Sequence, residues 1–156
     1  RTFKHLTLQM SYRLTNQMSM WLNNNVMHQE RIKTCKDGAP VTLIFDNDNF
    51  HSSETAGYFF GHYIVNLINS GVDINQIMIL SPSLRGPAIN KCVYTIKANS
   101  RIPVYIPKND DEPVNRDLIK NKVLFSSIHQ SKGIERDYVF LFKWRITSCF
   151  LKELFH

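Results

Sequence analysis

Residues 122–142 read Lys-Val-Leu-Phe-Ser-Ser-Ile-His-Gln-Ser-Lys-Gly-Ile-Glu-Arg-Asp-Tyr-Val-Phe-Leu-Phe. Two apolar runs, 123–128 and 138–142, flank a polar loop. Short runs rich in Val, Ile and Phe and bounded by turn residues are typical of buried strands. Loops that follow the strands of open α/β sheets are where such folds bind ligands. This stretch therefore predicts two strands of a sheet and a functional loop between them.

The rest of the chain alternates β-like runs with helical stretches. Further strands are predicted at residues 5–10, 41–45, 77–80 and 102–106. A first helix is predicted over about 15–26, with Thr15 as its cap. A second is predicted to start near Glu54, after Ser53, and to end before Gly71. A third is predicted over about 87–97. The apolar spacing of the second helix predicts that it turns these side chains inward: Phe59, Tyr63, Ile64, Leu67 and Ile68.

Continuous apolar strands separated by amphipathic helices predict an α/β fold with a mostly parallel sheet covered on both faces. A chain of 156 residues is long enough for one domain with a real core and too short for two full ones. It contains no internal repeat, low-complexity segment or domain linker. We therefore expect residues 1–156 to form a single domain.

Charge and cysteine content narrow the class of protein. The net charge of +6 favours an acidic partner such as nucleic acid. Cys35, Cys92 and Cys149 are far apart, odd in number and without metal-ligand spacing, which indicates an intracellular protein of the nucleus or cytoplasm and no metal site. No apolar run approaches the roughly 20 residues that span a bilayer, no signal-peptide pattern appears in the sequence, and the sequence starts at Arg1 without a methionine. We expect a fragment that binds no membrane.

Four residues of the polar loop have chemistry suited to nucleic acid or nucleotide. Gly133 permits a backbone turn that a β-carbon would block. Lys132 supplies a point charge for phosphate, and His129 can donate to a phosphate or stack near a base. The carboxylate of Glu135 accepts two hydrogen bonds, as a ribose diol offers.

Residues 127–135, reading Ser-Ile-His-Gln-Ser-Lys-Gly-Ile-Glu, resemble motif V of the UvrD/Rep family of superfamily 1 DNA helicases, Thr-x-His-x-x-Lys-Gly-Leu-Glu. The resemblance implies a RecA-like, three-layer domain, the second lobe of a P-loop-NTPase-like motor. It implies that Gly133 and Glu135 contact the nucleotide, while Ser127, His129 and Lys132 face DNA. Ser127 stands where the family has threonine. Arg136 replaces an aromatic residue, a variant most similar to helicases of large DNA viruses.

Residues 8–13, Leu-Gln-Met-Ser-Tyr-Arg, resemble motif IV of the same family, Leu-x-x-Asn-Tyr-Arg-Ser. The resemblance implies that Tyr12 stacks on adenine and that Arg13 reaches the γ-phosphate as the catalytic arginine. A planar guanidinium fork matches phosphate oxygens. Ser81 follows another predicted strand, together with Arg85, where contacts to the DNA backbone are expected.

The resemblance also implies an ATP-driven DNA helicase whose other parts lie outside these residues. The chain contains no Gly-x-x-x-x-Gly-Lys-Ser/Thr loop, and residues 107–121 leave no room for the family's helical insertion. It stops before motif VI. The expected cofactors are ATP and a magnesium ion held mainly by the missing first lobe, and the expected partners are that lobe and single-stranded or duplex DNA. We expect the isolated chain to be inactive as an ATPase.

Two other functions fit parts of the sequence. The run 41–45 ends on Asp46-Asn-Asp48, which resembles the nucleophile and acid/base aspartates of haloacid-dehalogenase-like phosphatases. The alternative reading of Asp46 and Asp48 is a turn and helix-capping cluster before Ser53. The second rival function is non-catalytic: a nucleic-acid-binding or protein-binding module, or a helicase remnant.

Overall fold

A computed structural model describes residues 9–42, 52–108 and 114–143. Within these ranges the chain divides into two compact units, residues 9–42 in one and the remainder in the other. Each unit is described by itself. The prediction of one domain over 1–156 stays a prediction.

The smaller unit is built around a short helix. Strand β1 (Met10–Ser11) pairs in parallel with β2 (Lys33–Thr34), and α1 (Asn16–Leu22) lies between them in the chain. Thr15 caps α1, as predicted, by accepting a hydrogen bond from the Met18 N–H at 3.3 Å. Most of the predicted 5–10 strand and residues 43–45 of the 41–45 strand lie outside the described residues.

The predicted helix over 15–26 changes character part-way. After Leu22 the chain continues as a π-helical segment, Asn23–Met27. The amide of Asn23 explains this change, because its nitrogen donates to the Ile32 carbonyl at 2.9 Å and its oxygen accepts from the Ile32 N–H at 3.0 Å. Asn23 therefore fixes the returning chain, and its side chain is buried.

The larger unit contains a four-stranded parallel sheet in the order β4-β5-β3-β6. Its strands are Ile77–Leu80 (β3), Val104–Tyr105 (β4), Val123–Ser126 (β5) and Tyr138–Leu141 (β6). A one-turn 3₁₀ helix, Ile74–Gln76 (η2), leads into β3. The predicted α/β class and parallel sheet are confirmed. Each predicted strand of this unit is present and one to three residues shorter than expected, apart from 77–80, which matches.

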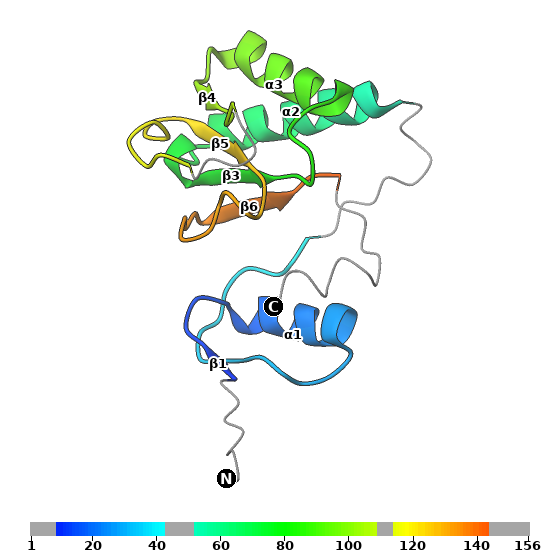
Figure 1. Cartoon of the computed structure of the whole chain (residues 1–156), viewed down its shortest axis with the longest axis vertical. Coiled ribbons are helices and arrows are strands. Elements are labelled where there is room, and N and C mark those ends of the chain that lie inside the picture. The colour runs from blue at the N-terminus through cyan, green and yellow to red at the C-terminus, as the bar shows by residue number, and fades with distance from the viewer. Residues whose placement is uncertain (1–8, 43–51, 109–113, 144–156) are drawn as a thin grey trace, which may run out of the picture. The chain divides into compact units, whose positions relative to one another are not determined.

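Helices α2 (Ser53–Asn69) and α3 (Pro87–Ser100) lie together on one side of the sheet (Figure 1). The cap of α2 is Ser52, one residue before the predicted Ser53, and its hydroxyl accepts from the Thr55 N–H at 3.1 Å. Glycines allow the close approach of the two helices. A β-carbon at Gly57 would stand 2.1 Å from the Ala88 carbonyl oxygen.

This close packing corrects the predicted inward face of α2. Ile64 is fully buried, and Leu67 and Ile68 pack against the core, as expected. Phe59 and Tyr63, however, are 54% and 43% exposed. The face toward α3 uses small residues instead of large ones, so the large aromatic residues turn outward.

The sheet buries both faces, but with different partners. Alternate strand residues Ile77, Ile79, Val123 and Phe125 pack under α2 and α3. The opposite set, Met78, Leu80 and Leu124, is covered by chain segments on either side of β5, through Val114, Ile119, Ile128 and Ile134.

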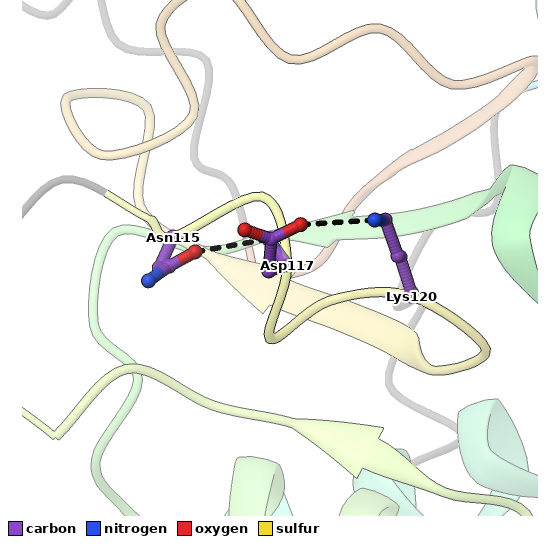
Figure 2. A network of polar contacts seen from close by, with 3 residues as sticks. All are labelled: Asn115, Asp117 and Lys120. Atoms are coloured by element: carbon purple, nitrogen blue, oxygen red, sulfur yellow. Dashed lines mark hydrogen bonds and ion pairs between the residues drawn. The ribbon is translucent and has the colours of Figure 1, made fainter.

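The turn that leads into β5 is held by local polar contacts, shown in Figure 2. The Asn115 Oδ1 accepts from the Asp117 N–H at 2.9 Å, and the Asp117 carboxylate pairs with Lys120 Nζ at 2.9 Å. Because both members of this pair are largely exposed, it contributes less than about 1 kcal/mol. The buried Val114 and Ile119 anchor the turn more strongly.

Candidate functional site

The carboxyl ends of three adjacent strands meet at one edge of the sheet. The Ser81 N–H donates to the Ser126 carbonyl at 3.1 Å, and the Phe142 N–H donates to the Leu80 carbonyl at 2.8 Å. The residues that follow β5, β3 and β6 therefore start side by side. Ser81 and Ser127, which were singled out from distant parts of the sequence, both lie at this edge.

A cavity of about 250 Å³ opens at the same edge, between the end of β3 and the start of α3. It is lined by Ser81, Pro82, Ser83, Arg85, Gly86, Pro87, Ala88, Ile89 and Lys143. Ser81 is only 2% exposed. Strand alternation places it on the helix side with Ile77 and Ile79.

The electrostatics of this cavity favour an anion. Helix α3 begins there with Pro87 in its first turn and without a side-chain cap or an acidic residue. Its first N–H groups are therefore left for a ligand, and the helix dipole adds positive potential. The cations Arg85 and Lys143 line the cavity. Lys143 Nζ donates to Ser53 Oγ at 2.7 Å, which brings the start of α2 to the same edge.

The β5–β6 loop is ordered by its own buried amide. Gln130 is 5% exposed, and its Oε1 accepts from the Ser127 hydroxyl at 3.1 Å. The backbone N–H of Gln130 in turn donates to the Ser127 Oγ at 3.4 Å. The Ser131 N–H donates to the Ser127 carbonyl oxygen at 3.1 Å. The Ser127 hydroxyl thus shapes the loop, which limits the direct DNA contact expected of it.

Anchored in this way, the loop presents its other polar residues to solvent. His129, Lys132, Gly133 and Glu135 are all exposed. Gly133 has a φ of +79°, so the glycine is required by the backbone. Arg116 fixes the same point by donating from its Nη2 to the Gly133 carbonyl at 3.0 Å.

The loop then returns toward the amino ends of the strands. Arg136 Nη2 points to the Ile119 carbonyl at 3.5 Å, and Ile119 lies just before β5. Burial lowers the pKa of Arg136, while the Asp73 carboxylate opposes that shift. Asp73 precedes β3. Glu135 is therefore on the returning arm of the loop, whereas Ser127 and His129 are on the arm that leaves the carboxyl edge.

The motif IV residues lie in the smaller unit. Tyr12 is 76% exposed and Arg13 is exposed as well, directly after β1. Tyr12 therefore presents a free ring surface, as stacking on a base requires. Asp46 and Asp48, the aspartates of the phosphatase alternative, lie outside the described residues.

No group of three or more His, Cys, Asp or Glu side chains within the described ranges could hold a metal ion. No helix in those ranges is long and apolar enough to cross a membrane.

No protein-family model matches the chain, and no curated protein or solved structure matches it significantly. The helicase resemblance accordingly rests on the motifs alone.

Three residues of the site were not singled out by sequence reasoning. Gln130 was an unassigned position of the motif, and its burial follows from its contacts with Ser127. Arg116 lies 17 positions from its partner Gly133, and no local pattern pairs them. Lys143 directly follows a predicted strand, and that position was the signal that could have identified it.

Proposed function

We propose that this chain is the second RecA-like lobe of a UvrD/Rep-type superfamily 1 DNA helicase and that its carboxyl strand edge binds single-stranded DNA. The observation that carries the proposal is the convergence at one edge. The motif V loop begins beside Ser81, and a cavity bearing Arg85, Lys143 and an uncapped helix start opens there. Phosphate groups are the anions that such a combination of donors fits.

The exposed residues of the loop extend this surface. His129 and Lys132 project from a backbone held by hydrogen bonds within the loop, so little backbone freedom is lost when they contact a phosphate. In the whole enzyme, Arg13, Tyr12 and Glu135 would contact ATP from this lobe, and the magnesium ligands would come mainly from the first lobe. The proposal is supported by the all-parallel sheet β4-β5-β3-β6, because a mostly parallel sheet is what the family resemblance implies.

The test is binding of a fluorescein-labelled 20-nucleotide oligo(dT) by the purified chain, followed by anisotropy from 25 to 200 mM salt. Binding should weaken as salt rises, because phosphate neutralisation releases counterions. Lys132→Gln and Arg85→Gln should each weaken binding and flatten the logarithmic salt dependence by about one unit. Lys120→Gln, on the turn of Figure 2, is the matched control and should change neither.

Two results would contradict the proposal. One is the absence of binding at 25 mM salt by a chain that circular dichroism shows to be folded. The other is equal weakening by Lys120→Gln and Lys132→Gln, which would show that only net charge matters and that no specific edge exists.

A further inference from the structure

The outer sides of α2 and α3 carry a second surface that the strand edge does not use. We call it the aromatic face and define it as Tyr58, Phe59, His62, Lys91 and Tyr94. Tyr94, Phe59 and Tyr58 are 66%, 54% and 43% exposed. The core is formed by the other sides of the same helices, through residues such as Ile64 and Cys92. The three named rings of the aromatic face lie outside the buried core cluster.

One cation joins the rings across the two helices. Lys91 Nζ lies 5.8 Å from the Tyr58 ring centroid and 5.5 Å from the Tyr94 centroid. The Tyr58 ring packs edge-to-face with the rings of His62 and Phe59. The ring centroids lie 4.4 Å apart for the pair with His62 and 5.7 Å apart for the pair with Phe59. The glycine contacts between α2 and α3 bring these side chains within reach of one another. The result is a cluster of rings around an ammonium group.

The composition of this surface indicates what kind of partner it fits. The large hydrophobic residues exposed on α2 and α3 are all aromatic, namely Tyr58, Phe59, Tyr63 and Tyr94, and no exposed Leu, Ile or Met accompanies them. Helix α3 contains two lysines and no acidic residue. Helix α2 contains one acidic residue, Glu54, which lies in its first turn. Rings interleaved with cations suit the flat bases and phosphates of a single strand, since stacking on an aromatic ring needs no particular base.

We infer that the aromatic face is a second contact for single-stranded nucleic acid, with bases stacked on Tyr58, Phe59 and Tyr94 and a backbone phosphate paired with Lys91. This inference concerns a different surface from the strand edge. It does not depend on the chain being a motor lobe, because it requires only a nucleic-acid strand.

The test compares matched tyrosine variants in the full 156-residue chain. Tyr58→Leu/Tyr94→Leu keeps apolar volume but removes both stacking surfaces, and it should weaken oligo(dT) binding about tenfold or more. Tyr138→Leu, on β6 and 41% exposed, is the matched control and should bind like the parent chain. Thermal unfolding of each variant confirms that the fold is retained. Photocrosslinking with 5-iodouracil oligonucleotides, with each crosslink assigned to a single residue by tandem mass spectrometry, should label Tyr58, Phe59 or Tyr94.

The outcomes separate this inference from the proposed strand-edge function. Loss of affinity in the double leucine variant, with normal affinity in Lys132→Gln, supports the aromatic face and contradicts the strand edge. Full affinity in the double leucine variant, with crosslinks confined to residues 81–85 and 127–135, overturns the aromatic face and leaves the strand edge intact. Crosslinks on both surfaces support both.

Discussion

At the residue scale, Gly133 controls the geometry of the β5–β6 loop. Its φ of +79° is unfavourable for residues with a β-carbon. Among the residues that the structure describes, only Arg116 Nη2, at 3.6 Å, lies near the position of that carbon. The penalty for Gly133→Ala is therefore backbone strain, about 1–2 kcal/mol, and not a clash. We expect Gly133→Ala to weaken oligo(dT) binding several-fold. Gly133→Asn should be milder, because asparagine adopts positive φ more readily. Equal affinity of all three proteins in the anisotropy assay would contradict this expectation.

Because the thiol of Cys92 is buried, we expect it to make the free energy of unfolding depend on pH. Burial raises its pKa from 9.0 to about 12. Between these values the unfolded chain has lost the thiol proton while the folded chain retains it, so this group's contribution to stability falls as pH rises. The expected slope is about 1.4 kcal/mol per pH unit. Below pH 9 both states are protonated and the contribution is constant.

Urea unfolding of the parent chain and of Cys92→Ala at pH 8, 9, 10 and 11 measures this effect, and the comparison cancels the titration of other groups. Cys92→Ala has a fixed cost for the lost sulfur, so the stability advantage of the parent chain should be constant up to pH 9 and shrink above it. A difference that stays constant to pH 11 would show that the thiol ionises as easily in the folded chain.

At the scale of elements, the contact between α2 and α3 depends on Gly57. A β-carbon there would meet the Ala88 backbone carbonyl oxygen at 2.1 Å, so the helices must move apart. Gly57→Ala should lower the free energy of unfolding by about 1–3 kcal/mol, although alanine is the better helix former. Asn66→Ala, on the exposed side of α2, is the control and should stay within about 0.5 kcal/mol of the parent chain in urea unfolding. A more stable Gly57→Ala variant would refute the close contact.

The same helix pair shows how far the sequence predicts the elements. The sequence was sufficient to place α2, α3, β3, β5 and β6. The spacing of apolar residues located the helices and the apolar runs located the strands, because each element buries a continuous group of apolar side chains. The prediction of which side chains of α2 point inward was partly wrong. Large residues were assigned to the core, whereas the contact of α2 with α3 uses glycines. The two-residue strand Lys33–Thr34 was missed, because its pairing with Met10–Ser11 depends on tertiary contacts.

At the scale of the whole molecule, sequence reasoning located the edge of the site but not its supports. Ser81 was predicted from its position after a strand and Ser127 from the motif V resemblance, and the parallel pairing of β3 and β5 brings them together. The supports Gln130 and Arg116 could not be predicted, because they act through contacts that form only after the loop has folded. The motif IV residues stand in a separate compact unit, so their joint action with Glu135 remains part of the proposal.

The proposed lobe function makes a prediction about ATP that involves the whole chain. Hydrolysis needs a phosphate-binding loop and a metal site, and the sequence has no Gly-x-x-x-x-Gly-Lys-Ser/Thr segment. The purified chain should therefore release no phosphate from ATP above a protein-free blank, even when oligo(dT) saturates it. Phosphate release followed colorimetrically, with and without oligo(dT), measures this. A release rate that persists through successive chromatography steps and disappears in Arg13→Ala would overturn the prediction, because the chain would then contain a complete catalytic site.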